Sequence, residues 1–224
     1  MFKTIKNAWA IPDLRRKILF TLLIIVIFRF GSCIPVPFLN VDALRALMAQ
    51  VESSGTALSY INMLSGGAFA NATLFAMGIT PYINSSIIMQ LLTVAIPPLE
   101  RMAKEGEEGR KKISTITRYV TVILGLIQGA AYYFYLRNSV ATVNGKATSI
   151  TLFNDGFAQI FSAFIIILCF TAGTALMMWL GEQINQKGIG NGISILLFAG
   201  IVARLPVTFG LLGTFLGQAF EMPS

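Results

Sequence analysis

Histidine is absent from this 224-residue chain, and charged residues make up only 12% of it. Without histidine, imidazole metal ligands, histidine general bases and triads that contain histidine are all excluded. The chain has only two cysteines, Cys33 and Cys169, in or next to separate apolar runs. We expect both to be small buried hydrophobic side chains, with no disulfide and no thiol chemistry. No cofactor and no metal are expected.

Apolar residues make up 55% of the chain, and the mean hydropathy is +0.71. A soluble domain carries roughly twice this fraction of charged residues. Several apolar runs approach or exceed the roughly 18 residues that suggest a spanning helix. The first of these apolar runs follows Arg15, Arg16 and Lys17. It is too long to be the apolar core of a signal peptide, so no signal peptide is expected. The composition predicts an all-α polytopic membrane protein.

Five transmembrane helices are expected, at about residues 18–34, 76–96, 119–136, 157–180 and 193–212. Residues 1–17 read as a basic amphipathic leader at the membrane surface, and residues 213–224 as the start of a further connection. Residues 58–75 are too small and too polar to span unaided, which predicts a short re-entrant, plug-like helix held inside protein.

Three connections are also expected from the pattern of charge and glycine. Residues 100–118 are the most charged stretch, and their glycines predict a flexible loop. Residues 137–155 are predicted to form a polar hairpin, because Asn144-Gly145 is a good two-residue β-turn. Residues 181–192 are predicted to form a tight glycine-rich turn.

Lys and Arg are distributed unevenly between the two sides of this topology. Most of them lie in residues 1–17, residues 100–118 and at Lys187, which all share the side of the N-terminus. The positive-inside rule therefore predicts a cytoplasmic N-terminus, and it explains the net charge of +7 without nucleic acid. Arg29 and Arg204 fall within spans. Arg29 either extends to the nearer interface or packs against a partner helix or cavity.

The stretch from Ser65 to Gln90 carries the clearest functional signal. Gly78 and Pro81 interrupt a run that would otherwise be expected to form an unbroken membrane helix. Unpaired backbone amides are costly in lipid, so such a break is tolerated only where protein or a water-filled cavity covers it. The break is therefore predicted to line a path.

Aliphatic residues recur at helical spacing after both of the chain's flexible sequences. Ile79, Ile83 and Ile87 lie four residues apart, as do Ile193 and Leu197 after the second glycine-rich stretch. Such rows are usually ordinary packing. Because both follow helix-breaking sequence, they also fit a hydrophobic constriction that gates an aqueous path by dewetting.

Three polar side chains lie within predicted spans: Asn84, Gln90 and Gln128. Such side chains are costly in a membrane unless paired. They are candidates for interhelical hydrogen bonds of about 0.6–2 kcal/mol each, weak enough for a helix seam to open.

Four separate stretches resemble the SecY family, whose members are the central subunit of the bacterial Sec protein-conducting channel. They are LFAMGITPYINSSIIMQLL (residues 74–92), WLGEQINQKGIGNGISILL (179–197), LRRKILFTLLIIVIFRFGSCIPVP (14–37) and KEGEEGRKKIS (104–114). The resemblance implies a channel subunit, not an enzyme, that passes unfolded secretory proteins across the bacterial cytoplasmic membrane and releases membrane segments sideways into it.

The resemblance also implies roles for individual residues. The pore ring would take Ile79, Ile83, Ile87, Ile193 and Leu197, and the lateral gate's polar cluster would take Asn84, Gln90 and Gln128. The plug would include Met63, Leu64, Ser65, Gly66, Gly67, Ala68, Phe69 and Ala70. Lys104, Arg110, Lys111 and Lys112 would face a cytoplasmic partner.

The implied partners are the small membrane subunits SecE and SecG, the SecA ATPase or the ribosome, signal sequences and secretory polypeptides, and membrane lipids. No direct DNA binding is expected. The family has ten spans in two inverted halves, so the other ring residues and gate helices are expected from a C-terminal half. A half channel is not expected to conduct alone.

Two other functions remain as alternatives. Half of a secondary transporter would also have a broken span, but such proteins usually keep an ionisable residue near the midplane, and no acidic residue lies mid-span here. An intramembrane enzyme would need a nucleophile with a base, or paired acids, within the bilayer.

Overall fold

The computed structural model describes residues 11–53, 59, 62–63, 65–143, 146–153, 156–203, 205 and 210. Most of the leader, plug residue Leu64, Arg204 and the connection of residues 213–224 lie outside the described residues. Predictions that concern these parts of the chain stay predictions.

The described chain is mostly helical, as its composition predicts. The helices are α2 (Pro12–Gly31), α3 (Val41–Ser53), α5 (Thr80–Ala95), α6 (Pro97–Lys104), α7 (Glu107–Asn138), α8 (Gly156–Lys187) and α9 (Gly192–Val202). Strands β1 (Val140–Val143) and β2 (Lys146–Ser149) pair antiparallel, with Val143 opposite Lys146. This register leaves two residues between the strands and confirms the predicted hairpin, whereas its turn residues Asn144 and Gly145 lie outside the described residues.

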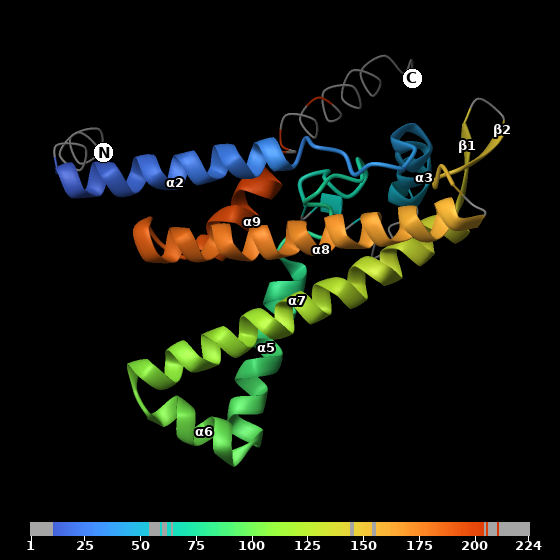
Figure 1. The fold of residues 1–224 in the computed structure, drawn as a ribbon. Coiled ribbons are helices and arrows are strands. Elements are labelled where there is room, and N and C mark those ends of the chain that lie inside the picture. Colours follow the sequence, from blue (N-terminus) through green and yellow to red (C-terminus); the bar gives the residue numbers. More distant parts are fainter. Residues whose placement is uncertain are drawn as a thin grey trace, which may run out of the picture.

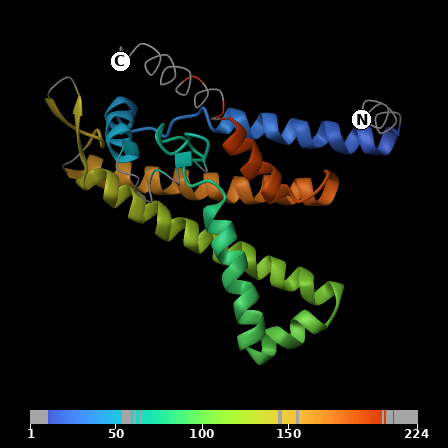
Figure 2. The same ribbon diagram turned by 180° about the vertical axis from the view of Figure 1, so that it is seen from behind.

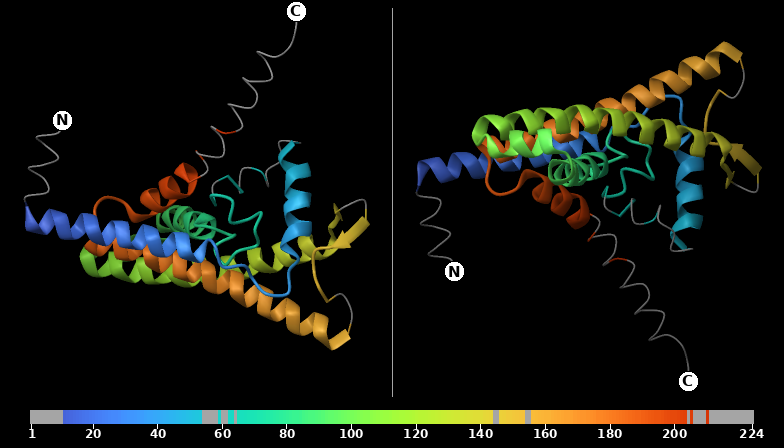
Figure 3. Two further views of the ribbon diagram at one scale, coloured as in Figure 1. Left: turned by 90° about the horizontal axis from the view of Figure 1, so that it is seen from above. Right: turned by 90° about the horizontal axis from the view of Figure 1, so that it is seen from below.

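The long helices run lengthwise, with α8 between α2 and α7 (Figure 1). The short helix α3 packs against the β-hairpin at one end of these helices. At the other end lie the start of α2, the end of α8 and the turn between α6 and α7. Seen from behind, α5, α6 and α7 form three sides of a triangle (Figure 2). Residues 65–79 lie between α3, α5 and the long helices (Figure 3).

Each predicted span overlaps an observed helix, but only some of these helices are long and apolar by themselves. Within the described residues, α7 and α8 each have the length and composition to cross a membrane. Helices α5 and α6 would make a third span if counted together, although the chain bends by 100° between them. Helix α9 is a shorter apolar helix, and α2 carries Arg15, Arg16 and Lys17 near its start.

Small residues allow α7 and α8 to approach closely. Gly125 and Gly129 lie four residues apart on one face of α7, and both are buried. A Cβ atom at Gly125 would lie 3.2 Å from Thr174 Cγ2, and one at Gly129 would lie 3.5 Å from Phe170 Cβ. Small residues at this spacing let membrane helices gain backbone-to-backbone packing, which drives their association in lipid.

Two predicted connections are wrong because helices extend through them. The charged stretch 100–118 is not a flexible loop: it holds the end of α6, a turn at Gly106 and the start of α7. An i,i+4 ion pair joins Lys104 to Glu100 (2.6 Å), which supports helix there. A second ion pair joins Lys112 of α7 to Glu105 of the turn (3.4 Å). The glycine-rich turn is shorter than predicted, because α8 continues through Gly181 to Lys187.

The break in the second span is longer than predicted, and the plug is less helical. Ser59, Asn62 and Met63 are helical, whereas residues 65–79 form a series of turns that we call the turn segment. Helix α5 begins only at Thr80, with Pro81 in its first turn. Gly78 has φ +58°, a conformation that glycine adopts without strain, and this redirects the chain into α5.

Two buried clusters hold the fold together. One joins α3, the turn segment, α7, α8 and the hairpin through residues such as Leu44, Phe69, Leu136 and Ile150. The other joins α2, the turn segment, α8 and α9, and contains Ile24, Phe28, Phe75, Ile79, Met177, Leu180, Ile184 and Leu196. The turn segment contributes to both clusters, so it is part of the core.

The close approach of the turn segment to α8 generates a stability prediction. A Cβ atom at buried Gly173 would overlap the carbonyl oxygen of Leu74. Because backbone cannot move aside as a side chain can, we expect Gly173→Ala to cost about 1–3 kcal/mol. Thermal unfolding of the purified protein in detergent checks this. Ala172→Val, at an exposed neighbour on the same helix, is the control and is expected to leave Tm unchanged.

Candidate functional site

The turn segment satisfies its own backbone polar groups through its side chains. The Phe69 amide donates to Ser65 Oγ (3.1 Å), and the Ala70 amide donates to Asn62 Oδ1 (3.0 Å). The Thr73 hydroxyl donates to the Ala68 carbonyl (3.2 Å). Asn62, Ser65 and Thr73 are all buried. Non-helical backbone is tolerated at membrane depth only when its polar groups find such partners, so these small polar residues make the break possible.

The second half of the turn segment is tied to the chain that follows α2. The Val36 amide donates to the Ala72 carbonyl (2.8 Å), and the Leu74 amide donates to the Ile34 carbonyl (3.0 Å). Pro35 and Thr73 form an isolated antiparallel bridge between these hydrogen bonds. Residues 72–74 are therefore fixed by backbone pairing on the side that leads to α5.

The first half of the turn segment contacts α9, α3 and α7. Gly66 lies against the backbone of α9, where an added Cβ atom would come 2.7 Å from the Gly200 carbonyl oxygen. Arg45 of α3 donates from Nε to Asn71 Oδ1 (2.7 Å). The hydroxyl of Tyr132 on α7 donates to the Phe69 carbonyl (3.1 Å). Most hydrogen bonds of residues 65–70 otherwise stay within the segment and Asn62–Met63.

Four of the five predicted ring residues belong to one apolar cluster. Ile79 is buried at the start of α5, and Ile83, Ile193 and Leu197 pack against the same cluster. A small cavity beside them is lined by Ser65 and Phe75 of the turn segment and by Leu196 and Leu197 of α9. Aliphatic side chains from two helices thus close against each other and against the turn segment.

Ile87 does not join this cluster. Its side chain is 50% exposed, and it lines a different cavity with Leu124 and Gln128 of α7. One further helical turn along α5, from Ile83 to Ile87, carries the row away from the cluster and toward α7. The structure brings Ile87 to the seam between α5 and α7 instead.

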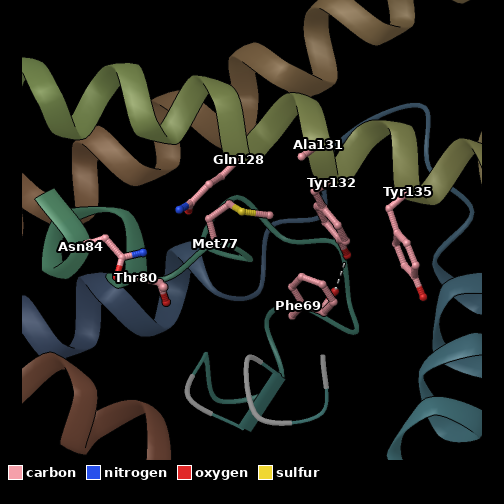
Figure 4. A pocket seen from close by; sticks show the side chains of 8 residues that line it. All are labelled: Phe69, Met77, Thr80, Asn84, Gln128, Ala131, Tyr132 and Tyr135. Atoms are coloured by element: carbon pink, nitrogen blue, oxygen red, sulfur yellow. Dashed lines mark hydrogen bonds between the residues drawn. The ribbon is translucent and has the colours of Figure 1, made fainter. Parts of the chain in front are cut away.

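Asn84 and Gln128 line a common cavity of about 470 Å³ at the seam between α5 and α7. Its other lining residues are Phe69, Met77, Thr80, Ala131, Tyr132 and Tyr135. Figure 4 shows Asn84 and Gln128 toward one side of this cavity, with Phe69 and Tyr132 toward the other. We call it the seam cavity.

The predicted interhelical hydrogen bonds of the three polar residues are not found among the described residues. The side chains of Asn84 and Gln128 make no hydrogen bond there. Gln90 donates to Ser86 of its own helix (3.3 Å) and lines a separate cavity with Arg110 and Ser114 of α7. Asn84 and Gln128 thus leave polar groups available in a largely apolar cavity, whereas Gln90 lies elsewhere.

Arg29 reaches a backbone carbonyl of another helix. Its Nη2 donates to the Ala199 carbonyl of α9 (3.0 Å), and its guanidinium lies 5.6 Å from the centre of the Phe28 ring. Of the two interpretations open from the sequence, packing against a partner helix is therefore correct. The positive charge of Arg29 near the C-terminal end of α9 also interacts favourably with the negative end of that helix dipole.

The four residues predicted to contact a partner lie on the hairpin of α6 and α7, but only two of them form ion pairs with described residues. Lys104 and Lys112 pair with Glu100 and Glu105, whereas Arg110 and Lys111 make no ion pair with any described residue. Nearby, Arg118 of α7 pairs with Glu182 of α8 (2.8 Å), whose side chain is 12% exposed. This pair links the two long helices at the end where the basic residues gather.

Several contacts of the site were not predicted from the sequence. Leu196 is fully buried in the same apolar cluster as Ile79, and its spacing of three residues from Ile193 is the signal that would have identified it. The pairing of Phe69 with Tyr132 has no signal in the sequence, because it joins residues far apart along the chain.

The seam geometry predicts which cysteine pairs can be crosslinked. With Cys33 and Cys169 replaced, we expect Asn84→Cys with Gln128→Cys to react efficiently with a short bismaleimide, because both side chains line one cavity. The control pair Gln90→Cys with Gln128→Cys lines no common cavity and is expected to crosslink several-fold less. Equal yields, measured by gel mobility after proteolysis between the helices, would contradict the placement of Gln90.

Comparisons with known proteins agree with this architecture. The SecY family model matches residues 73–222. The protein translocase subunit SecY of Bacillus subtilis (strain 168) is 45% identical over 213 residues, covering 94% of this chain and 46% of that protein. The SecY subunit of Pseudomonas aeruginosa is 46% identical over 211 residues, covering 94% and 43%. This chain thus spans about half the length of the curated relatives it matches.

Two solved structures share the fold. One is described as the structure of a protein-conducting channel, with a TM-score of 0.53, 19% identity, and coverage of 89% of this chain and 41% of that one. The other is canine Sec61 in a ribosome–channel complex from the endoplasmic reticulum, with a TM-score of 0.52 and the same identity and coverage. From its apolar helices, its fold and the family model, this membrane protein belongs to the SecY family.

Proposed function

We propose that this chain forms the N-terminal half of a protein-conducting channel, which passes unfolded secretory proteins across a bacterial cytoplasmic membrane and releases membrane segments sideways. The observation that carries this proposal is the cluster of Ile79, Ile83, Ile193 and Leu197 closed against the turn segment. Curated relatives named protein translocase subunits support it.

In this proposal the aliphatic cluster is half of a ring around the translocating chain. Branched apolar side chains exclude water when they close, yet they can part around a guest because no directional bond holds them. The turn segment, which packs beneath the cluster at Gly66 and Phe75, acts as the plug. The other ring residues would come from a C-terminal half.

The seam between α5 and α7 serves as this half's part of the lateral gate. An apolar signal sequence would match the lining of the seam cavity, and Asn84 and Gln128 would bond its backbone or polar side chains. Each such bond is worth about 0.6–2 kcal/mol, which is weak enough for release into lipid.

The distribution of cations supports an N-terminus in the cytoplasm. Arg15, Arg16 and Lys17 of α2, Lys187 of α8 and the α6–α7 hairpin lie at the same end of the long helices. Arg110 and Lys111, which form no ion pair within the described chain, would then face a SecA-type ATPase or a ribosome. SecE- and SecG-type small subunits and lipids would contact the exposed apolar faces of the helices.

A channel is favoured over a transporter or an enzyme. The charged side chains near the cluster are already engaged: Arg29 donates to the Ala199 carbonyl, and the carboxylate of Glu182 is paired with Arg118. A coupling carboxylate or a nucleophile with its base would be needed for the other functions. The proposal therefore involves no cofactor and no covalent chemistry, and partner proteins supply the energy.

Crosslinking to a stalled secretory chain tests the proposed function. In a full-length channel lacking other cysteines, we expect Ile83→Cys to crosslink the chain only when its signal sequence is export-competent. Val94→Cys, on an 81% exposed side chain of the same helix, is the control and is expected to stay unlinked. Efficient export without a crosslink at position 83 would place the path elsewhere.

Polar substitutions in the ring should weaken its seal. We expect Ile83→Asn with Ile193→Asn to raise the resting ion conductance of the full-length channel at least about tenfold, the factor for a barrier lower by about 1.4 kcal/mol. Export of precursors with weakened signal sequences should also rise. Ile87→Asn, outside the cluster, should change conductance little. Planar-bilayer recordings measure the resting conductance of each variant. Equal conductance in all variants would rule out the ring assignment.

A further inference from the structure

Helix α9 is held at its start by directional contacts with α8 and α2. The Gly192 amide donates to Asn185 Oδ1 (2.7 Å), and the Ile189 amide, just before α9, donates to Thr21 Oγ1 (3.2 Å). A Cβ atom at Gly192 would overlap the Gly181 carbonyl oxygen, so the start of α9 lies directly on the backbone of α8. The first turn of α9 therefore has one defined position.

The end of α9 reaches α2 (Figure 1). Helix α9 carries one hydroxyl, at Ser194, and otherwise only apolar side chains. A helix that is apolar all round has no face that composition directs toward protein, because lipid is as apolar as the core. Gly200 lies against Gly66, whose amide donates to Met63, so this contact is van der Waals packing. A directional contact at this end would decide how α9 tilts.

Arg29 of α2 supplies such a contact. Its Nη2 donates to the Ala199 carbonyl (3.0 Å), which also accepts the Ala203 amide (3.3 Å). Ala199 lies in the last turn of α9, where carbonyl groups have free acceptor capacity and carry the negative end of the helix dipole. Arg29 forms no ion pair with a carboxylate of the described residues. A charge in an apolar segment is costly, and the hydrogen bond to α9 offsets part of that cost.

We propose that Arg29 is a positioning residue that fixes the end of α9 against α2, and that it thereby places Leu197 beside Ile79 in the apolar cluster. Leu197 lies two residues before Ala199 and lines one small cavity with Ile79. Ile193 lies one turn earlier, next to the anchored start of α9, so its position does not depend on Arg29. The inference rests on the proposed function, in which Leu197 is part of the ring.

Two cysteine pairs report on the two ends of α9 separately, in a full-length channel lacking other cysteines. Ile79→Cys with Leu197→Cys reports on the end, because both positions line one cavity. Gly181→Cys with Ile193→Cys reports on the start, because a Cβ atom at Gly181 would lie 3.7 Å from Ile193 Cγ1, an ordinary contact. The rate of crosslinking by the shortest bis-methanethiosulfonate is measured by gel mobility after proteolysis between the paired positions.

Three variants of α2 are compared in both backgrounds. Arg29→Met keeps a long side chain without a donor, and we expect it to slow the Ile79–Leu197 crosslink at least about tenfold, the population change for one lost hydrogen bond to a charged group. The Gly181–Ile193 crosslink should not change. Arg29→Lys keeps a charged donor and should retain most of the wild-type rate. Ser32→Ala is the matched control, because the Ser32 hydroxyl donates within its own helix, to the Phe28 carbonyl (2.9 Å).

Resting conductance and Tm separate positioning from a general structural role. Conductance should rise several-fold in Arg29→Met, because a displaced Leu197 opens the ring, and should stay at the wild-type level in Ser32→Ala. Similar Tm values are expected, because Arg29→Met also removes a charge from an apolar segment. A lower Tm in Arg29→Met with both crosslinks slowed would show a general structural role and would overturn the inference.

Equal rates of the Ile79–Leu197 crosslink in the wild type and Arg29→Met would also overturn it, as would an equal loss in Arg29→Lys or Ser32→Ala. Failure of the proposed function is distinguishable, because crosslinking needs no secretory chain and no export. A slower Ile79–Leu197 crosslink in Arg29→Met with unchanged conductance would keep Arg29 as the residue that positions α9, and would count against the ring instead.

Discussion

The need to satisfy every backbone polar group away from water is the constraint on which this structure depends. The chain breaks a membrane helix at residues 65–79, where lipid offers no hydrogen-bond partner. Ser65 and Thr73 supply such partners from within the segment, Asn62 supplies another from just before it, and residues 34–36 pair with the backbone of residues 72–74. Without these bonds the break would cost several kcal/mol per exposed group, and the chain would favour a continuous helix.

Close backbone approach complements this internal bonding. Gly173 and Gly66 leave room for the turn segment against α8 and α9, while Gly125 and Gly129 bring α7 and α8 together. Lipid tails are as apolar as leucine, so helices in a membrane gain association energy from dispersion and close packing rather than from the hydrophobic effect. The small residues therefore stabilise this fold in the way that large apolar residues stabilise a soluble core.

The scarcity of strong contacts in the apolar cluster of Ile79 and Ile83 and at the seam suits the proposed channel. The buried members of this cluster are all apolar, and the seam cavity contains amide groups without partners among the described residues. Neither arrangement resists opening strongly, since dispersion contacts can be re-formed with a guest and amides can bond a passing chain. In contrast, α3 packs with the turn segment, α7, α8 and the base of the β-hairpin in a separate buried cluster.

The sequence alone was enough to predict the membrane class, the helical regions, the hairpin and the broken second span. These follow from local composition: long apolar runs, Asn144-Gly145, and Gly78 with Pro81. Four of the five residues predicted for a ring also pack in one cluster, because the i, i+4 rows place them on single helix faces. Their role as a ring stays a prediction. The paired charges of residues 100–118 and the helix continuing past Gly181 were not predicted, because ion pairs and packing outweigh the intrinsic preference of glycine.

Tertiary structure alone decided which polar and aromatic side chains meet. Gln90 shares a helix with Asn84, yet the crossing of α5 over α7 places it in a different cavity. Ile87 shares that helix with Ile83, yet it lines a cavity with Asn84 and Gln128 instead of joining the cluster of Ile83. Arg29 found its partner on α9, and Phe69 found Tyr132 across 63 residues of chain. Local sequence sets which face of a helix a residue occupies, but the angles at which helices cross determine what that face contacts, and those angles depend on all the packed residues together.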